Sequence, residues 1–204
     1  KMNHKIDVRP SPIAGQWYSS NPDSLANSID RYMDEAALPS LDGQVIGVIA
    51  PHAGHLYSGP VAGYAFAALR GLQPEAVVVV SPMHYPYYEP LLSTAHEAYH
   101  TPLGDIPVDG EALNKLDRYL KESLGSGLGR VRRDPEHSLE IELPFLQRAV
   151  AGPFSLIPVM IVDPGVRTAR LLGEAISRLV IESGWTPGKE AVLVASTDLS
   201  HFYP

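Results

Sequence analysis

Four residues that can bind a metal ion or transfer a proton closely follow apolar stretches of the sequence. They are His52, His84, Asp198 and His201. Each apolar stretch has the length and composition of a buried β-strand, and the carboxyl ends of parallel strands open onto a common crevice. We therefore predict that these side chains, although far apart in the chain, share one site at the edge of a sheet.

The residue types of this predicted site point to metal-dependent chemistry. Two neutral imidazoles leave coordination positions open, and together with a carboxylate they form the arrangement that suits non-haem Fe(II), with Zn(II) as the alternative. A histidine that lies near the metal without binding it titrates close to neutrality, so it can act as a general acid or base. His201 follows Asp198 by three residues, so Asp198 can orient it or accept its proton.

Each of these residues also has a purely structural interpretation. An isolated histidine is more often a hydrogen-bonded core residue than a ligand, and Asp198 could cap the turn that carries Ser200 and His201. The same three residues raise the alternative of a Ser-His-Asp hydrolase. However, residues so close in sequence rarely aim at one another, and no G-x-S-x-G turn is present. The coincidence of three strand ends favours the shared site.

A fourth segment, PEHSLEIELP, adds carboxylates and a histidine. Glu136 and Glu140 are four residues apart, so they and His137 would share one face of a helical turn. The alternative is that these carboxylates form the solvated face of a helix, which is the commoner fate of such residues. Surface or rim positions are predicted for the remaining histidines, which are His4, His55, His96 and His100.

The hydrophobic pattern predicts a single α/β domain whose mostly parallel (mixed) central sheet has helices on both faces. Asn21 as N-cap and Pro22 in the first turn mark the start of one helix, and Pro144 predicts a kink in a later one. The predicted strands span 44–50, 76–82, 154–162 and 191–196, the predicted helices 21–36, 59–71, 110–123, 137–150 and 166–180, and a β-hairpin or similar excursion 91–109. The predicted buried face of 59–71 consists of Val61, Tyr64, Ala65, Ala68 and Leu69.

Composition argues against several classes of function. Sixteen Lys and Arg against 23 Asp and Glu give a net charge of −7, which argues against nucleic-acid binding, and the short basic stretch Gly129–Asp134 is interpreted as a solvated loop. The chain contains no apolar run near the ~20 residues that span a bilayer and no signal-peptide pattern, so we predict a cytoplasmic protein with no membrane partner. The absence of cysteine excludes thiolate metal ligands and thiol nucleophiles within these residues.

Five segments of the sequence carry a resemblance to a known family. They are SPIAGQWYSSNP, APHAGHLYSG, VVVVSPMHY, EHSLEIELPFLQ and ASTDLSHF, and they span nearly the whole chain in the family's order. On these motifs the chain resembles the Memo family, whose microbial members are called AmmeMemoRadiSam system protein B. That family is similar in fold to the class III extradiol dioxygenases, which cleave catechol-type rings with non-haem iron.

The resemblance implies roles for individual residues. It makes His52 and His84 metal ligands, with Fe(II) as the expected metal and Zn or Cu as alternatives. It makes His201, with Asp198 beside it, the catalytic acid or base, and it implies that His137 lines the catalytic pocket.

The resemblance also implies a third metal ligand. This ligand is a Cys in animal members and a carboxylate in the dioxygenases, and it lies further along the chain than the DLSH motif. We therefore expect that residues 1–204 form a single Memo-like domain truncated at its C-terminus, and that the third ligand lies beyond Pro204.

Two functions from different classes follow. The first is a non-haem iron-dependent redox enzyme or dioxygenase. The alternative is a non-catalytic binding module whose crevice accepts a phosphorylated or carboxylated peptide or small molecule. A zinc hydrolase is a third hypothesis, and the resemblance further implies an AMMECR-like or radical-SAM partner protein. The side chains considered for anion contacts, with core, rim or solvated-loop positions as the alternative, are Tyr57, Ser58, Tyr85, Tyr87, Tyr88, Arg132 and Arg133.

Overall fold

The computed structural model describes residues 5–199, and a six-stranded sheet forms its centre. The strands of this sheet are β2 (Gly47–Ala50), β3 (Ala76–Pro82), β4 (Leu91–Thr94), β7 (Gly129–Val131), β8 (Ser155–Ile161) and β9 (Ala191–Ser196). Their order is β2-β9-β3-β8-β4-β7, and neighbours pair in parallel except for β4 and β8, which are antiparallel. The predicted mixed, mostly parallel sheet is therefore confirmed.

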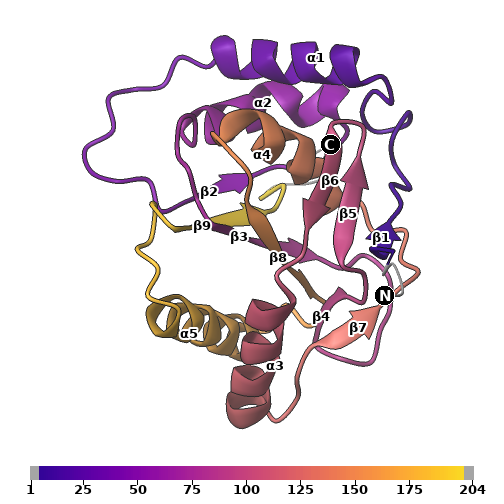
Figure 1. Cartoon of the computed structure of the whole chain (residues 1–204), viewed down its shortest axis with the longest axis vertical. Coiled ribbons are helices and arrows are strands. Elements are labelled where there is room, and N and C mark those ends of the chain that lie inside the picture. Colours follow the sequence, from indigo (N-terminus) through magenta and orange to yellow (C-terminus); the bar gives the residue numbers. More distant parts are fainter. Residues whose placement is uncertain (1–4, 200–204) are drawn as a thin grey trace.

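Helices cover both faces of the sheet, as predicted. They are α1 (Pro22–Asp34), α2 (His55–Ala67), α3 (Gly110–Leu124), α4 (Leu143–Ala149) and α5 (Val166–Glu182). Helices α1, α2 and α4 contact one another on one face, and α3 and α5 pack together on the other (Figure 1). This layering leaves the carboxyl ends of the parallel strands open at one edge, where an α/β fold binds its ligands.

Strand β3 shows why the sequence contains an unbroken apolar run. Val77 and Val79 belong to the hydrophobic core under α1, α2 and α4, whereas Ala76 and Val78 belong to the core under α3 and α5. Successive side chains of a strand point to opposite faces, so a strand covered on both sides needs apolar residues at every position. Each fully buried Val contributes roughly 1.5–3 kcal/mol relative to an exposed one.

The start of α1 follows the prediction. The Asn21 side chain accepts a hydrogen bond of 2.9 Å from the backbone N–H of Ser24, and Pro22 occupies the first turn. The N-cap satisfies one of the backbone donors that every helix start leaves without an intrahelical partner. The apolar face then packs inward through Leu25, Ile29 and Met33.

The prediction for α2 was wrong in its start and in its buried face. The helix begins at His55 instead of Gly59, and Val61 and Tyr64 of the predicted face are 62% and 47% exposed. Within that predicted face only Leu69 is fully buried. The helix is apolar on nearly every side, so its sequence carried little periodic signal to distinguish one face from another.

Small residues on the buried side of α2 let it approach α1 closely. A Cβ atom added to Gly63 would lie 2.4 Å from the Tyr32 carbonyl oxygen, and one added to Gly59 would lie 2.5 Å from the Tyr32 ring. The contact between the helices therefore requires Gly63, and a side chain at Gly59 would have to displace the Tyr32 ring. This contact fixes the amino-terminal end of α2, which follows directly after the PHAG loop.

Two predicted boundaries in the second half of the chain are corrected. Residues Gly129–Val131 form strand β7 at the edge of the sheet instead of a solvated loop. The predicted kinked helix begins with a 3₁₀ turn, η1 (Glu140–Glu142), and continues as α4, with Pro144 in the first turn where proline is tolerated. Glu136 precedes this turn, so the two glutamates predicted on one helical face are separated.

A second, three-stranded sheet lies beside the first. Its strands are β1 (Val8–Arg9), β5 (Ala98–Thr101) and β6 (Gly104–Pro107), with β5 between the others. β5 and β6 form an antiparallel hairpin, which confirms the predicted excursion, and β1 pairs in parallel with β5. This small sheet places the side chain of Arg9 against the segment that precedes η1.

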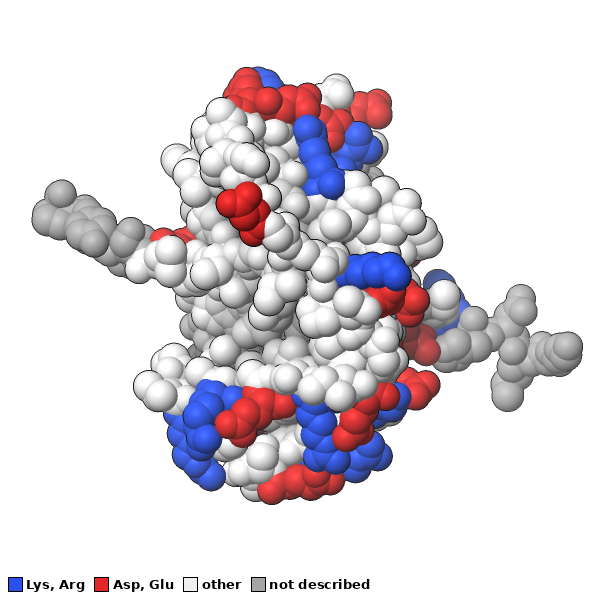
Figure 2. All heavy atoms as spheres, turned by 90° about the vertical axis from the view of Figure 1, so that its left-hand side faces the viewer, with Lys and Arg blue, Asp and Glu red and all other residues white. Residues whose placement is uncertain are grey.

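One hollow of the described chain is apolar, and none of the predicted metal ligands lines it. Its volume is 740 Å³, and its walls come from β2, β9, α5 and the segments beside them, for example Ile49, Ile176 and Leu193. Figure 2 shows an uncharged, indented band across the middle of this side of the molecule, with charged side chains above and below it. No helix within residues 5–199 is long and apolar enough to cross a membrane.

Candidate metal centre

The strand order brings three predicted strand ends together. β9 lies between β2 and β3 and is parallel to both, so the three carboxyl ends point the same way. His52 follows β2, His84 follows β3 and Asp198 follows β9. The backbone N–H of His52 donates a hydrogen bond of 2.8 Å to Asp198, and the ring centroids of His52 and His84 are 5.4 Å apart. The expected meeting of these residues is therefore observed.

A third histidine joins the first two. The His137 ring centroid lies 4.8 Å from that of His84 and 5.7 Å from that of His52. We call these three residues the histidine cluster, in which one ligand atom from each side chain lies within 4.8 Å of the other two. His137 comes from the loop before η1, and its other side packs on the Trp17 ring at a centroid distance of 4.0 Å.

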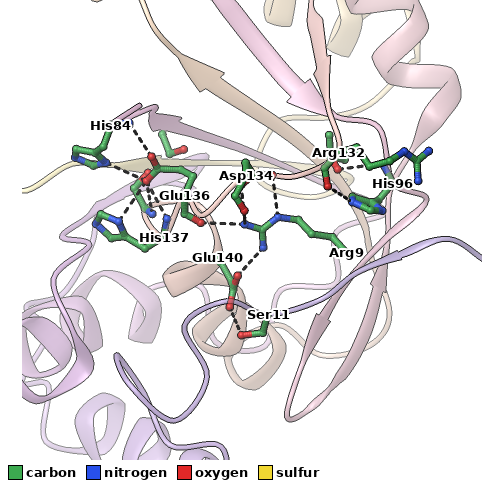
Figure 3. Close-up of polar contacts among 12 residues, drawn as sticks. Arg9, Ser11, His84, His96, Arg132, Asp134, Glu136, His137 and Glu140 are labelled. Atoms are coloured by element: carbon green, nitrogen blue, oxygen red, sulfur yellow. Dashed lines mark hydrogen bonds and ion pairs between the residues drawn. The ribbon is translucent and has the colours of Figure 1, made fainter. Parts of the chain in front are cut away.

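Glu136 orients two members of the histidine cluster (Figure 3). Its Oε1 atom accepts hydrogen bonds of 2.9 Å from the His84 Nδ1 atom and from the His137 backbone N–H, and its Oε2 accepts one of 2.6 Å from the His84 backbone. Burial raises the pKa of Glu136, but the hydrogen bonds from His84 and Ser138 outweigh it and lower that pKa to about 2. An ionised carboxylate only accepts, so the His84 Nδ1 atom donates and its Nε2 atom is left as a ligand.

His137 is neutral at neutral pH. Its pKa is lowered to about 4, mainly because burial disfavours the charged ring. The negative charge of Glu136 opposes this effect, and the neighbouring His84 and His52 reinforce it. A neutral imidazole is the form that binds a metal ion, so His137 needs no deprotonation before binding at pH 7.

His52 is buried and held by residues at the end of β9. Its Nδ1 atom lies 3.0 Å from the Ser196 hydroxyl, and its Nε2 atom lies 3.6 Å from a carboxylate oxygen of Asp198. Asp198 therefore lies beside the histidine cluster. His201, the predicted catalytic acid or base, lies outside the described residues, so its role stays a prediction.

A buried arginine fixes the segment that carries Glu136. Arg9 is 3% exposed, and its guanidinium donates hydrogen bonds of 2.7 Å to Asp134, 2.6 Å to Glu140 and 3.0 Å to the Glu136 backbone carbonyl. Figure 3 shows these contacts running from Glu140 through Arg9 to Asp134, next to the histidines. The small sheet thus sets the position of the loop from which two of the site residues come.

Comparison with known protein families matches residues 9–204 to the family described as Memo-like protein. The chain belongs to the Memo family. It is 32% identical to a MEMO1 family protein of Pyrobaculum aerophilum over 204 residues, which covers 97% of this chain and 70% of that protein. MEMO1 family proteins of Methanosarcina mazei and Thermotoga maritima are each 34% identical, over 97% and 95% of this chain and 68% and 70% of their own lengths. The resemblance carried by the five segments is therefore confirmed.

The histidine cluster of this Memo protein fits a metal ion. Metal–nitrogen bonds of about 2.0–2.1 Å in a tetrahedral site separate the nitrogens by roughly 3.3 Å, so the donor atoms, within 4.8 Å of one another, need a small inward movement. The side chain of His84 is 43% exposed and has room for that movement. Three imidazoles without a thiolate suit Zn, Cu and Fe, so the donors do not select one metal. Within residues 5–199 this is the one group of three such side chains with this spacing.

Other histidines of this Memo protein lie away from the cluster. His55 and His96, predicted at the surface or rim, are only 5% and 9% exposed, so that prediction was wrong. His55 is the first residue of α2, its Nε2 atom lies 3.1 Å from the Ile141 carbonyl oxygen, and burial lowers its pKa to about 4. His100 is exposed, as predicted, and His4 lies outside the described residues.

The residues considered for anion contacts are dispersed. Ser58 is buried and donates to a backbone carbonyl at 2.8 Å, whereas Tyr57 and Tyr88 are 79% and 104% exposed. Arg132 pairs with Asp7 and lies at the opposite end of Figure 3 from the histidine cluster. The Arg132 side chain therefore does not reach over the cluster.

The sequence pointed to Glu136 and Glu140 as contributors to the site, but it did not identify the residues that they contact. Glu136 and Glu140 are 1% and 0% exposed, so the alternative of a solvated helical face is wrong for both. The sequence did not indicate the roles of Arg9 and Ser196, because it does not distinguish a buried polar residue from an exposed one. Only the partners that the fold supplies distinguish the two cases.

Proposed function

We propose that this Memo protein binds Fe(II) through the histidine cluster and acts as a non-haem iron-dependent redox enzyme of the dioxygenase type. The observation that supports the proposal is the meeting of three imidazoles from β2, β3 and the loop before η1. Asp198 adds a carboxylate 3.6 Å from His52, and nitrogen donors with one carboxylate suit Fe(II) better than a site of imidazoles alone. When bound, Fe(II) would supply redox chemistry and Lewis acidity.

The protein's own groups prepare the site for a cation. Glu136 is ionised and holds the His84 Nδ1 atom as a donor, and His137 is neutral at pH 7. Glu136 and Asp198 place two carboxylates next to three imidazoles, and opposite charge at this distance favours a cation. In this proposal His201, three residues after Asp198 in the sequence, moves protons at the substrate.

The alternative is a binding module for phosphorylated or carboxylated ligands. An anion in this crevice would face Glu136 and Asp198, while Arg132 is already paired with Asp7. Like charges repel, so the anion would need a bound cation to neutralise the site first. Metal binding therefore comes before ligand binding in either function.

The proposal extends to location and partners. The ligand is a small molecule or peptide that reaches the crevice in the cytoplasm. The proposed partner is an AMMECR-like or radical-SAM protein, and it rests on the family resemblance alone.

Metal analysis tests the proposed function. Wild-type protein, His52→Ala, His84→Ala and the matched control His100→Ala, which changes an exposed histidine, are purified without oxygen and their iron is measured. We expect about one iron per chain in the wild type and the control, and almost none in the two cluster variants. Equal iron content in all four proteins would refute the metal site. Oxygen uptake with a panel of catechols then tests the dioxygenase step, and no uptake by the iron-loaded protein refutes it.

A further inference from the structure

The hydroxyl group of Ser196 lies at the centre of a buried polar network. Ser196 ends β9 and is 3% exposed. Its Oγ atom lies 3.0 Å from the His52 Nδ1 atom, 2.6 Å from the Ser138 carbonyl oxygen and 2.8 Å from the Glu142 Oε1 atom. One hydroxyl with a single proton therefore contacts three polar atoms.

Counting protons assigns a direction to each contact. The Ser138 carbonyl oxygen can only accept, and its distance is the shortest of the three, so the Ser196 proton is directed to it. The Ser196 oxygen then has only lone pairs left for its two other neighbours. The His52 Nδ1 atom must therefore carry a proton, and Glu142 must be a carboxylic acid that donates.

The surroundings of Glu142 favour its protonated form. The side chain is 1% exposed, and burial raises its pKa to about 8. A hydrogen bond donated by Ser196 to the ionised carboxylate would oppose that shift, whereas the negative charge of Asp198 adds to it. Glu142 is therefore mostly neutral at pH 7, as the proton count requires.

We propose that Ser196 and Glu142 are positioning residues that commit the His52 Nδ1 atom to donating a hydrogen bond, so that its Nε2 atom offers a lone pair to a cation. This inference rests on the proposed metal-binding function and extends it to residues that do not touch the metal. His84 reaches the same tautomer by a different route, because its Nδ1 atom donates to the ionised Glu136. One ligand is thus oriented by a charged carboxylate and the other by a neutral acid acting through a hydroxyl.

The tautomer of His52 is measured in metal-free protein by two-bond ¹⁵N–¹H correlation spectra, with His52→Gln used to assign its signals. We expect Nδ1 to be protonated in the wild type. Glu142→Gln should keep that tautomer, because the amide N–H donates to the serine oxygen as the acid does. Ser196→Ala should give a mixture, and Ser196→Thr should restore the single tautomer. Protonation of the wild type at Nε2, or a shift to Nε2 in Glu142→Gln, would overturn the inference.

Titration with Zn(II) alone measures the consequence for binding. Loss of a residue that orients a ligand typically weakens metal affinity by about 10- to 100-fold, which is the expected effect of Ser196→Ala. Ser93→Ala is the matched control, since Ser93 is also a buried strand serine that donates to a backbone carbonyl. Thermal melts show whether each variant is folded. If Ser196→Ala does not fold, the tautomer of His52 in the wild type alone decides whether the inference holds.

The two readouts separate the inference from the proposed function. A wild type that binds no Zn(II) while His52 is protonated at Nδ1 supports the inference and refutes the metal site. A Ser196→Ala variant with unchanged tautomer and unchanged Zn(II) affinity overturns the inference and leaves the metal site standing.

Discussion

The Glu142→Gln variant should gain stability over the wild type as the pH rises. Glu142 has a pKa of about 8 when folded, against 4.5 for an ordinary glutamate. A carboxyl with a raised folded pKa keeps its proton in the native state after the unfolded chain has lost it. Ionisation then favours the unfolded chain, so wild-type stability falls from pH 4.5 upwards and levels off above pH 8. Glutamine does not ionise, so the Glu142→Gln variant avoids this loss.

The size of the effect follows from the two pKa values. Each pKa unit corresponds to about 1.36 kcal/mol, so the wild type should lose about 3–4 kcal/mol between pH 5 and pH 8 through this group alone. This loss is a large part of the roughly 5–15 kcal/mol that stabilises a typical domain.

Urea unfolding of both metal-free proteins between pH 5 and pH 8 measures the effect. Groups common to the two proteins, such as Glu136 and His137, cancel in the difference between their unfolding free energies. Glu111→Gln is the control, because Glu111 is 82% exposed and pairs with Lys115 on its own helix, so its difference should stay within about 0.5 kcal/mol. A difference for Glu142→Gln that is flat or falls with pH would refute a protonated Glu142.

Three further substitutions test the supports of the site. Arg9→Met should reduce the unfolding free energy by about 3–5 kcal/mol in urea, because two buried carboxylates lose their cation; a loss below 1 kcal/mol would contradict the buried network. Gly63→Ala should destabilise the protein by about 1–3 kcal/mol, since its Cβ would lie 2.4 Å from a backbone oxygen of α1. The control Gly173→Ala, whose Cβ would have no neighbouring atom within 4 Å, should not destabilise it. Equal effects of the two substitutions would show that α1 and α2 can move apart at little cost in free energy. Glu136→Gln should weaken Zn(II) binding about 10- to 100-fold in a calorimetric titration, because His84 loses a charged acceptor; unchanged affinity would exclude Glu136 as its orienting group.

The sheet was predictable from sequence because covered parallel strands need apolar residues at every position. Val77 to Val80 form such a run, and β3 lies at the centre of the sheet with helices on both faces. The buried face of α2 was not predictable, because a helix that is apolar on nearly all sides gives no period to read. The face that packs on α1 is instead set by Gly63, because a Cβ atom there would clash with the backbone of Tyr32.

The candidate site was predictable only as far as the strand ends reach. His52 and His84 follow strands, and the topology of a parallel sheet requires their loops to open on the same edge. Glu136 and Ser196 lie 52 and 144 residues from the histidines that they contact, so only the folded chain reveals those pairings. The buried positions of His55 and His96 were missed for the same reason, because their partners come from distant segments.

The hydrogen bonds on the outer side of the histidine cluster explain why its inner side is suited to a cation. The Nδ1 atoms of His52 and His84 are engaged by Ser196 and Glu136, which leaves their Nε2 atoms without a share in those bonds. A histidine kept only for packing needs no such fixed tautomer, whereas a ligand does, because a protonated nitrogen cannot bind a metal. Holding two imidazoles in this state, with His137 neutral beside them, costs conformational freedom during folding. Folding has already removed this conformational freedom when a metal ion binds. The metal affinity of the site should therefore depend on the hydrogen bonds of Ser196 and Glu136 as much as on the ligands.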